Sequence, residues 1–222
     1  MGKEIVSAPL SSDKVRSLYN SLSYVYDILT WYEIAPQKKA LEVLAMQHGS
    51  RVLEVGFGTA KTLTKFAGKV GDAEVYGLDI SVGMTKRAKK RVRSCSLSGN
   101  VDLILGDAGS SPFQNSVFDI VFSSYVLDLI DTPDILKFLS EFKRLLKRNG
   151  RLVLVSLTKG SKWYDSMRFY EWIYSHSPSL LGGCRPVILG PYLHQLGFKN
   201  ISRELVHAGL LMTTEIIWAD ND

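Results

Sequence analysis

The sequence has few cysteines and no long apolar run. Its 222 residues include two cysteines, Cys95 and Cys184, without CxxC spacing. Two thiols are too few for a disulfide framework or a cysteine-rich metal site, so we expect a protein of the reducing cytoplasm. No stretch approaches the ~18 consecutive apolar residues that a membrane-spanning helix needs. Residues 1–10 also lack the apolar region expected of a secretory signal.

Several catalytic signatures are also missing. The chain has no HExxH motif for zinc and no GxSxG turn for a nucleophilic serine. Its histidines, His48, His176, His194 and His207, are scattered, which is more typical of surface or packing positions than of a ligand set. We therefore expect no metal site and neither zinc-protease nor serine-hydrolase chemistry.

Charge and composition place few restrictions on partners. The formal net charge is +5, and 45% of the residues are hydrophobic, enough for one large α/β domain with a sizeable core. Six cations lie within Lys86–Arg93, and we interpret this segment as a solvated outer helix face rather than a site for an anionic partner. The chain shows no internal repeat, low-complexity tract or linker, so we expect one domain over residues 1–222.

The most informative stretch is RVLEVGFGTAKT, residues 51–62. An apolar run breaks at Gly56 and Gly58 and resumes at Thr59, the pattern of a buried strand, a tight turn and a helix start. Glycines are required in such a turn where a ligand approaches the backbone or where φ is positive. A glycine pair also occurs in ordinary turns, so the surrounding sequence must decide whether this turn binds a ligand. A dinucleotide-binding GxGxxG would place its third glycine at Lys61, which counts against NAD.

A second indication is Asp79, at the end of the predicted strand Glu74–Leu78 and 23 positions beyond Gly56. A carboxylate at such a strand end can accept hydrogen bonds from both hydroxyls of a ribose, in NAD and S-adenosylmethionine sites alike. Aspartate is also common as a turn residue or helix cap, here before Ser81. The two features at this separation predict a nucleotide-type site.

Two further segments extend the pattern. The predicted strand Val101–Leu105 runs into GDA at residues 106–108, and FDIVFSS follows at residues 118–124. The second of these is mostly apolar, as expected for a central parallel strand that is buried on both faces. Its carboxyl end, the side of an open α/β sheet where ligands bind, carries Ser124, Tyr125 and Asp128.

These features resemble the class I S-adenosylmethionine-dependent methyltransferases. Glu54, Gly56 and Gly58 match the acidic-x-GxGxG motif of that family, with Ala60 where its last glycine often stands. The GDA segment and the FDIV strand match the later progression of the family. The resemblance covers nearly the whole chain.

The resemblance is closest to the UbiE-type branch, whose members act in ubiquinone and menaquinone biosynthesis. Tyr26 and Asp27 resemble the N-terminal segment of that branch, in which a helix covers the cofactor. LKRNG at residues 146–150 resembles the common LKPGG that precedes a strand, with Arg148 in place of proline. The resemblance implies a Rossmann-like α/β fold with a seven-stranded, mostly parallel sheet of order 3214576 and helices on both faces.

The resemblance also implies S-adenosyl-L-methionine as cofactor and S-adenosyl-L-homocysteine as product. Asp107 and the following amide would face the adenine, Ser124 would lie near the methionine part, and Tyr125 would lie towards the acceptor. The expected cofactor-binding residues are Tyr26, Glu54, Gly56, Gly58, Thr59, Asp79, Ile80, Met84, Asp107, Ala108, Ser124 and Tyr125.

Aromatic residues indicate where the acceptor would bind. Tyr19, Trp163 and Tyr170 are expected to line one apolar pocket above the methyl group, although an aromatic helix face packed in the core is the alternative. If the acceptor must lose a proton, the weak candidates for the base are Tyr125, Asp128, His176 and His194.

Periodicity and turn residues predict the bounds of the elements. Helices are expected at about 12–30, from Pro36 to before Gly49, at 82–94, from Thr132 to Asn149–Gly150, within 163–174 and at 192–196. Later strands are expected at 152–156, 198–206 and 211–218. Residues 1–49 would form a helical cover, 50–157 the cofactor-binding core, 158–197 an acceptor-side lid and helix, and 198–222 a terminal strand hairpin.

The sequence therefore favours a methyltransferase that acts on a small lipophilic or aromatic acceptor, such as a quinol-type ring. A phospholipid or small amine is the alternative acceptor. Lys61 and the GDA segment argue against a nicotinamide-dependent reductase, whereas a non-catalytic cofactor-binding domain stays open. We expect no nucleic-acid partner, and peripheral membrane contact only if the acceptor is a lipid. The oligomeric state is left open.

Overall fold

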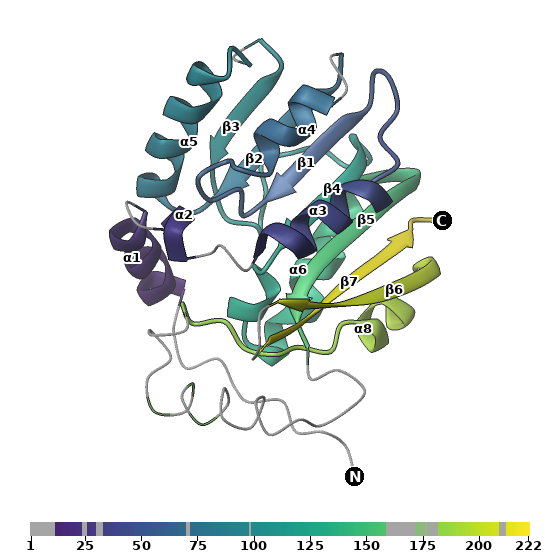
Figure 1. Ribbon diagram of the computed structural model, residues 1–222. Coiled ribbons are helices and arrows are strands. Elements are labelled where there is room, and N and C mark those ends of the chain that lie inside the picture. Colours follow the sequence, from purple (N-terminus) through teal and green to yellow (C-terminus); the bar gives the residue numbers. More distant parts are fainter. Residues whose placement is uncertain are drawn as a thin grey trace.

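Seven strands form one sheet in the order β3-β2-β1-β4-β5-β7-β6 (Figure 1). The computed structural model describes residues 12–23, 26–29, 33–69, 72–97, 99–158, 172, 174, 176, 182–208 and 212–222. The sheet order confirms the expected 3214576. The strands are β1 (Arg51–Val55), β2 (Glu74–Asp79), β3 (Val101–Leu105), β4 (Phe118–Ser124), β5 (Leu146–Leu157), β6 (Lys199–Ala208) and β7 (Met212–Asp220).

Parallel pairing places the functional loops at one edge of the sheet. β1 pairs in parallel with β2 and with β4, β2 pairs with β3, and β4 pairs with β5. The terminal strand β7 runs antiparallel to both β5 and β6. Val55 is in register with Leu78 and with Ser123, so the carboxyl ends of β1, β2 and β4 lie side by side. Loops that leave these ends can therefore form a common site.

Helices cover both faces of the sheet (Figure 1). One face carries α3 (Ile34–Val43), α4 (Leu63–Lys69) and α5 (Val82–Ser94), and the other carries α6 (Thr132–Leu145) and α8 (Gly190–Gln195). Two short N-terminal helices, α1 (Ser12–Leu22) and α2 (Tyr26–Leu29), lie at the carboxyl ends of the strands, and a short 3-10 helix, η2 (Leu127–Leu129), follows β4 (Figure 1). The site is therefore enclosed by elements from both ends of the sequence.

The strands read as continuous apolar runs because their side chains alternate between two cores. In β1, Val52 belongs to the core beneath α3, α4 and α5, and Leu53 belongs to the core beneath α6 and α8. Both side chains are completely buried. At about 25 cal/mol per Å² of buried apolar surface, these two cores supply the main stabilising contribution to the fold.

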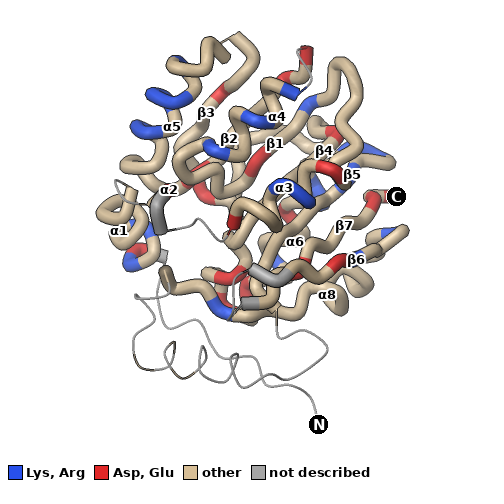
Figure 2. Tube along the Cα trace, viewed as in Figure 1, with Lys and Arg blue, Asp and Glu red and all other residues tan. Residues whose placement is uncertain are grey.

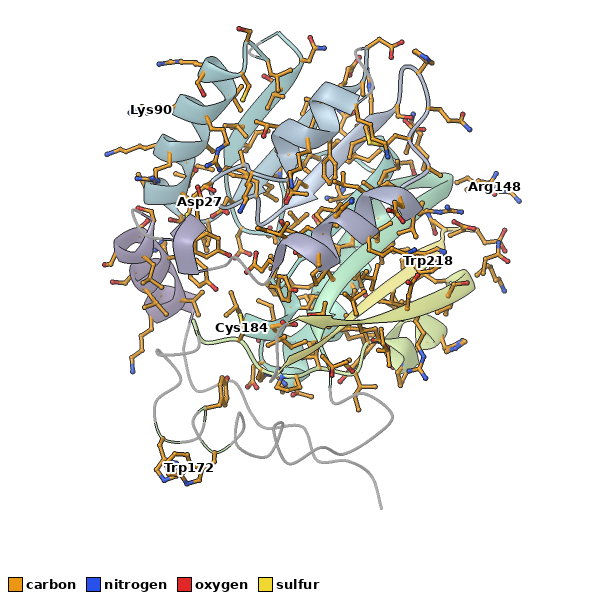
Figure 3. All side chains as sticks on the ribbon, viewed as in Figure 1. Asp27, Lys90, Arg148, Trp172, Cys184 and Trp218 are labelled. Carbon is orange, nitrogen blue, oxygen red and sulfur yellow. The ribbon has the colours of Figure 1, made fainter. Side chains whose placement is uncertain are left out.

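Helix α5 shows how the sequence separates a core face from a charged face. Ser81 caps the helix by accepting a hydrogen bond from the Met84 amide at 3.1 Å. Met84, Ala88 and Val92 follow at intervals of four residues and are buried. The cations run along the outer side, and Lys90 points away from the sheet (Figures 2 and 3). The expected solvated face is therefore present, with one exception among the cations that is described below.

The long helix before β5 ends earlier than the sequence predicts. The expected end at Asn149–Gly150 is wrong, since α6 ends at Leu145 and β5 begins at Leu146. The carbonyls of Arg144 and Leu145 accept hydrogen bonds from the amides of Ser116 and Val117, at 2.9 and 3.0 Å. Pairing with the segment before β4 thus satisfies the terminal carbonyls that a longer helix would bond internally.

The N-terminal segment forms two helices instead of the single helix expected at 12–30. α1 ends at Leu22, and the Ser23 hydroxyl donates to the Asn20 carbonyl at 2.9 Å. Such local side-chain bonds compete with helix continuation.

No helix in the part of the chain that the structure describes is long and apolar enough to cross a membrane.

Candidate functional site

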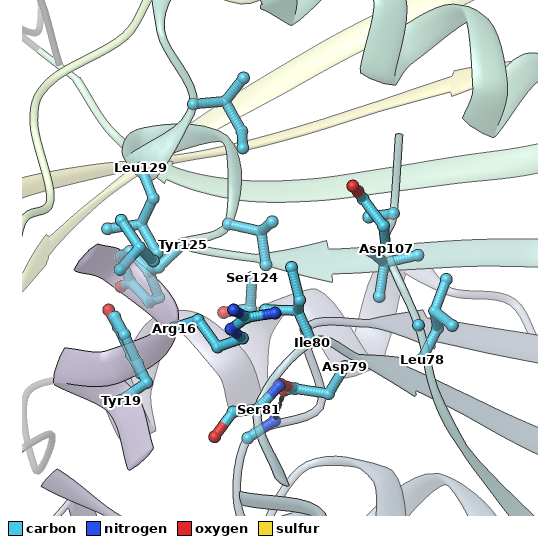
Figure 4. A pocket seen from close by; sticks show the side chains of 18 of the residues that line it. Arg16, Tyr19, Leu78, Asp79, Ile80, Ser81, Asp107, Ser124, Tyr125 and Leu129 are labelled. Atoms are coloured by element: carbon cyan, nitrogen blue, oxygen red, sulfur yellow. Dashed lines mark hydrogen bonds between the residues drawn. The ribbon is translucent and has the colours of Figure 1, made fainter. Parts of the chain in front are cut away.

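A pocket, the main pocket, opens where β1, β2 and β4 end beneath α1 (Figure 4). Its enclosed cavity volume is about 120 Å³, and the empty space including the open mouth is about 880 Å³. Arg16 and Tyr19 project over it from α1, opposite the strand-end residues Asp79, Asp107 and Ser124 (Figure 4). The lining consists of Val15, Arg16, Tyr19, Tyr26, Val55, Gly56, Gly58, Leu78, Asp79, Ile80, Ser81, Gly106, Asp107, Ala108, Ser124, Tyr125, Val126, Leu129, Ile130 and Phe138.

The floor of the main pocket is the loop that follows β1. Gly56 has a φ of 73° and donates its amide to the Leu78 carbonyl at 2.7 Å. A Cβ atom at this position would lie 2.1 Å from Cγ2 of Val126, so only glycine fits. Ala60, where the motif often has glycine, also has a positive φ of 60°. This conformation explains the glycine preference at that position. The predicted helix start at Thr59 is wrong, because α4 begins only at Leu63.

Asp79 joins the loop after β1 to the loop after β2. Its Oδ2 accepts the Gly58 amide and its Oδ1 accepts the Ser81 amide, each at 2.8 Å. Burial raises the pKa of Asp79 to about 6 despite these two bonds. Asp79 therefore orders the turn before α5, as expected of a turn residue, and it also lines the main pocket. Its role as a ribose acceptor stays a prediction.

The third strand end contributes Asp107 and Ala108 to the main pocket. The Asp107 Oδ1 accepts the Gly109 amide at 2.7 Å, which fixes the turn after Gly106. A Cβ atom on Gly109 would lie 3.1 Å from the Phe138 ring, so the loop packs closely against α6. This part of the lining offers a carboxylate beside an apolar surface.

Tyr125 stands where β4 gives way to η2, with a left-handed φ of 58°. Such a conformation is costly for a side chain this large and is often found at functional sites. The Tyr125 amide bonds to the Val155 carbonyl at 2.7 Å, and its hydroxyl lies 3.1 Å from the Thr214 hydroxyl. Burial, and then the nearby Glu33, raise the pKa of Tyr125 well above its usual value. Its phenol is therefore protonated at neutral pH.

A smaller pocket, the polar annex, adjoins the main pocket and shares Tyr26, Gly56, Gly58 and Ser124 with it. Its lining consists of Tyr26, Asp27, Glu33, Gln37, Glu54, Gly56, Phe57, Gly58, Thr59, Lys61, Thr62 and Ser124. Glu54 is 3% exposed, and its Oε2 has no hydrogen-bond partner. Burial, followed by the nearby Asp79, raises the pKa of Glu54 well above its usual value. The annex therefore combines burial with unsatisfied polar groups.

Hydrogen bonds among three polar residues hold the short helix α2 over the glycine loop. Thr59 donates its hydroxyl to Oδ1 of Asp27 at 2.6 Å. Arg91 of α5 donates to the Thr59 carbonyl at 2.7 Å and also bonds to Oδ2 of Asp27. Arg91 is thus the exception among the cations of α5, because its side chain points towards α2 and the glycine loop. The Tyr26 ring lies against Gly58, where an added Cβ would be 3.8 Å from its Cε1.

Comparisons with known proteins show which enzymes this chain is similar to. A family model described as a methyltransferase domain matches residues 52–150. A demethylmenaquinone methyltransferase of Bacillus mycoides strain KBAB4 is 29% identical over 216 residues, covering 85% of this chain and 89% of that protein. One of Listeria monocytogenes strain EGD-e is 26% identical, covering 89% and 92%. This chain is an S-adenosylmethionine-dependent methyltransferase, similar to the UbiE-type demethylmenaquinone methyltransferases.

Solved structures agree with this fold. A methyltransferase from Aquifex aeolicus superposes with a TM-score of 0.62 at 22% identity, covering 84% of this chain and 89% of that one. The cyclase SpnF gives a TM-score of 0.79 at 18% identity, covering 99% of both chains. Because one fold can serve a cyclase and methyltransferases, the likeness to these structures shows the architecture and leaves the activity to the sequence relatives.

Most predicted cofactor residues of the UbiE-like methyltransferase lie together around the two pockets. The main pocket is lined by Tyr26, Gly56, Gly58, Asp79, Ile80, Asp107, Ala108, Ser124 and Tyr125, and the annex adds Glu54 and Thr59. Met84 is the exception. Its side chain is 1% exposed within the core face of α5, and it lines neither pocket. The helical spacing with Ala88 and Val92 already marked it as a core residue.

Three of the four candidate bases in the methyltransferase line neither of the two pockets. Asp128 is 0% exposed and lines neither pocket, and its Oδ2 accepts the Leu157 amide at 2.9 Å. His194 is exposed on α8, and His176 is exposed with its ring 2.8 Å from the Trp172 carbonyl. Tyr125 alone of the four lines the main pocket.

Of the predicted acceptor residues, Tyr19 lines the main pocket. Its hydroxyl donates to the Gly182 carbonyl at 3.2 Å, which ties α1 to the segment before Cys184. Trp163 and Tyr170 lie outside the described residues, as do most residues of the expected aromatic helix at 163–174. Among the residues that the structure describes, no group of three or more His, Cys, Asp or Glu side chains could hold a metal ion.

Sequence reasoning missed several residues that line the two pockets of the methyltransferase. Val15 and Arg16 come from α1, Glu33 precedes α3, and Lys61 follows the glycine loop. The glycine motif placed Lys61 nearby, so its position was accessible from sequence. Glu33 carried no such signal, since it reaches the site only through the path of the chain between α2 and α3.

Proposed function

We propose that this methyltransferase holds S-adenosylmethionine in the main pocket and transfers its methyl group to a small lipophilic acceptor, with a quinol-type ring as the leading candidate. The acceptor class is inferred from four apolar or aromatic residues that line the main pocket: Val15, Tyr19, Leu129 and Ile130. They share the pocket with the polar strand ends, so a ring or prenyl group can be buried against them away from water.

The polar strand ends supply partners for the cofactor. Asp79 would accept hydrogen bonds from the ribose hydroxyls with lone pairs that its two backbone bonds leave free. Asp107 and the amide of Ala108 would face the adenine ring. Ser124, whose buried hydroxyl has no hydrogen-bond partner, would meet the methionine part. The orphaned hydroxyl and the close glycine loop both fit a ligand of this size and polarity.

The chemistry needs orientation more than it needs a catalytic side chain. The sulfonium of S-adenosylmethionine supplies an already activated methyl group when the cofactor is bound. The main pocket would align the acceptor with that group and exclude water. Tyr19 and Tyr125 line it with protonated phenols, because burial raises the pKa of both groups well above the usual value. A protonated phenol does not take a proton from the acceptor, so neither tyrosine acts as its base.

Relatives support the quinol-type acceptor over the alternatives. The two relatives described above are both named demethylmenaquinone methyltransferase, and they match at high coverage. A phospholipid amine or small amine is the alternative acceptor, and a phospholipid would bring the protein to a membrane surface. Nucleic acid is disfavoured because Lys86, Lys89, Lys90 and Arg93 are exposed on the outer side of α5 and line neither pocket.

The experiment is to measure methyl transfer from labelled S-adenosylmethionine to four acceptors: a demethylated naphthoquinol, a phospholipid amine, a small polar amine and RNA. Transfer to the naphthoquinol is expected to dominate. Tyr19→Ala should lower kcat/KM for it by roughly tenfold, since truncation of a buried aromatic costs more than 1 kcal/mol. Trp163→Ala and Tyr170→Ala test the remaining predicted acceptor residues.

Tyr76→Ala is a suitable control, because Tyr76 is an aromatic residue of β2 that lines neither pocket. Transfer only to RNA or to the polar amine, at a rate unchanged by Tyr19→Ala, would contradict the lipophilic acceptor. Binding of NAD(P)H in place of S-adenosylmethionine would point to a reductase. Cofactor binding without turnover on any acceptor class would favour the non-catalytic alternative.

A further inference from the structure

Among the described residues that line the main pocket, Arg16 is the one lysine or arginine. It lies on α1 one turn before Tyr19, so the two side chains share the face of the helix that covers the pocket (Figure 4). The carboxylates of the lining, Asp79 and Asp107, lie at the strand ends opposite α1 (Figure 4). Positive charge therefore enters the pocket from the helix that also supplies Tyr19, a proposed contact of the acceptor.

The guanidinium of Arg16 is only weakly engaged by the rest of the protein. Its Nη2 donates to Oδ1 of Asp13 at 2.9 Å, and it forms no other hydrogen bond with the described residues. The side chains of Arg16 and Asp13 are 50% and 84% exposed, and a pair so exposed contributes little to stability. The remaining N–H groups of Arg16 are therefore available to an oxygen atom in the pocket.

The described lining of the main pocket contains no histidine, and its two carboxylates are already engaged. Asp79 and Asp107 each accept backbone amides in the turns at the strand ends. Tyr19 and Tyr125 are protonated, because burial raises the pKa of both phenols well above the usual value. An acceptor that must lose a proton would therefore lose it to water, and would depend on a nearby positive charge to hold the resulting anion.

We propose that Arg16 is a catalytic residue that binds the ionised oxygen of the acceptor, and that the acceptor is accordingly an aromatic ring with an ionisable hydroxyl. This inference rests on the proposed function and selects among its acceptors. Two positive charges around the acceptor, the guanidinium and the sulfonium, favour a phenolate and disfavour a cationic amine. The ionised oxygen in turn makes the ring carbon nucleophilic.

The reaction balances with water as the proton acceptor. The O–H bond of the ring hydroxyl breaks and its proton passes to water, while the phenolate oxygen bonds to Arg16. The bond from the methyl group to the ring carbon forms as the sulfur–methyl bond breaks, and the electron pair of the broken bond stays on sulfur as a neutral thioether. The same ring carbon then loses its proton to water, and the ring oxygen regains one. In total, one methyl group is transferred and one proton is released.

Other ionisable groups surround the proposed oxygen site. From α1 and α5, which pack together, they are Asp13, Lys14, Tyr19, Lys86 and Arg87. From α2 and the strand ends they are Tyr26, Asp79, Asp107 and Tyr125. Glu33 and Cys184 act on the pKa of both Tyr19 and Tyr125, and Asp128 acts on that of Tyr125. Burial raises the pKa of Glu33 to about 8, so its titration must be separated from that of the acceptor.

The experiment is to measure how kcat depends on pH for methyl transfer to a demethylated naphthoquinol that is kept reduced. Wild type, Arg16→Gln and Arg16→Lys are compared between about pH 6 and about pH 10. Lys14→Gln is the matched control, because Lys14 is an exposed cation of α1 that lines neither pocket. Glu33→Gln, alone and combined with Arg16→Gln, separates the titration of Glu33. The dimethyl ether of the same naphthoquinol tests the wild type without any variant.

In the wild type, kcat should rise with pH as the bound hydroxyl ionises. Arg16→Gln should lower kcat at neutral pH by roughly tenfold and move the half-maximal point about one pH unit higher, because one charged donor to the phenolate is lost. Arg16→Lys should keep most of the wild-type profile, since it restores the charge, and Lys14→Gln should match the wild type.

Two further results are expected if Arg16 acts on the acceptor. The shift caused by Arg16→Gln should persist in the Glu33→Gln background. The dissociation constant of S-adenosylhomocysteine, measured by titration calorimetry, should be the same for Arg16→Gln and wild type. The dimethyl ether, which has no hydroxyl to ionise, should not be methylated.

Coincident pH profiles for Arg16→Gln and wild type would overturn the inference, because a merely structural loss lowers the rate equally at every pH. An equal shift in Arg16→Gln and Arg16→Lys, or wild-type methylation of the dimethyl ether, would also overturn it. Turnover of the naphthoquinol together with any of these results sinks the inference alone. Wild-type transfer to a small amine and not to the naphthoquinol would overturn the proposed acceptor, and this inference with it.

Discussion

The guanidinium of Arg91 bonds to the carboxylate of Asp27, and this contact joins the basic helix α5 to the cover helix α2. Both side chains are less than one-third exposed. Burial alone would raise the pKa of Asp27, but the bonds from Arg91 and Thr59 outweigh it and hold this pKa below its usual value. The ionised pair therefore holds α2 against the glycine loop at pH values above the usual pKa of aspartate.

Loss of this pair should weaken cofactor binding. We expect Asp27→Asn and Arg91→Gln each to lower the affinity for S-adenosylhomocysteine several-fold, because the cover then spends more time open. A double-mutant cycle should give a coupling of about 0.5 to 1 kcal/mol, typical of a partly exposed pair. Arg93→Gln, an exposed cation on the same helix, is the control. Equal affinities for Arg91→Gln and Arg93→Gln would show that the pair does not act on binding.

Asp79 should matter for ligand affinity more than any other carboxylate on a strand end. Asp79→Ala removes a charged acceptor, and we expect affinity for S-adenosylhomocysteine to fall by ~1.5 to 3 kcal/mol. Asp102→Ala on β3, where the side chain is exposed, should leave affinity unchanged. Thermal melting of both variants checks that the lost bonds to Gly58 and Ser81 have not unfolded the loop. Unaltered binding by a folded Asp79→Ala variant would remove this residue from the site.

Gly56 should tolerate no side chain. A Cβ atom there would lie 2.1 Å from Val126 Cγ2, so the first obstacle lies within the protein itself, before any contact with the cofactor. We expect Gly56→Ala and Gly56→Val to abolish cofactor binding, and Gly56→Ala to lower unfolding stability by about 2 kcal/mol or more.

Gly49 is a control that separates the two costs of a side chain at Gly56, the positive φ and the clash with Val126. Its φ is 71°, almost the same as that of Gly56, but a Cβ atom there would meet nothing within 4 Å. Gly49→Ala should therefore show only the cost of the positive φ, about 1 kcal/mol. Truncation of Val126 in Gly56→Ala should recover part of the lost stability. Full binding by Gly56→Ala would show that the loop is misplaced.

Stability should depend on pH through Glu33. Burial raises the pKa of this carboxyl from 4.5 to about 8, so the folded state binds its proton more tightly than the unfolded state. The resulting stabilisation is fully present below about pH 4.5 and is lost as pH rises to about 8. Over that interval the contribution is on the order of 4 kcal/mol.

Denaturant unfolding of the cofactor-free protein between about pH 5 and about pH 8 measures this dependence. Glu33→Gln should show a flatter profile over the same interval, and Glu42→Gln, exposed on α3, should follow the wild type. Parallel profiles for Glu33→Gln and wild type would mean that Glu33 titrates near its ordinary value in the folded state.

Methyl transfer should not require a metal ion. In the described residues no group of three or more potential ligands comes together, and the sulfonium needs no Lewis acid to activate its methyl group. Turnover should therefore be unchanged by EDTA. Activity that is lost to EDTA and restored by one divalent ion would contradict this prediction.

Sequence patterns over neighbouring residues were sufficient for several elements and for the ligand edge of the sheet. α5, β3 and β4 have the predicted ends and β2 extends one residue further, because each is bounded by a turn or cap residue within its own sequence. Asp79 could be placed at the pocket because parallel strands necessarily end at the same edge. Such features depend on neighbours a few positions apart, and sequence alone reports those neighbours directly.

Local pattern failed where a distant segment competes for the same backbone groups. The end of α6 is set by hydrogen bonds from Ser116 and Val117 to its last carbonyls, across about 28 positions of sequence. Asp128 follows a ligand-side strand, yet its carboxylate turns away to the Leu157 amide. The hydrophobic periodicity of the sequence reveals neither of these two contacts.

The sequence by itself determined the positions of several strands, the glycine turn and the acidic strand ends, because alternation, turn residues and capping act over short distances. Only the tertiary structure decided that Glu33 and Lys61 face one annex, that Arg91 of a basic helix turns inward to Asp27, and that Tyr125 meets Thr214. These pairs join elements separated by tens of residues. Their partners are chosen by packing geometry and by the cost of leaving a buried charge unpaired, which are properties of the folded chain.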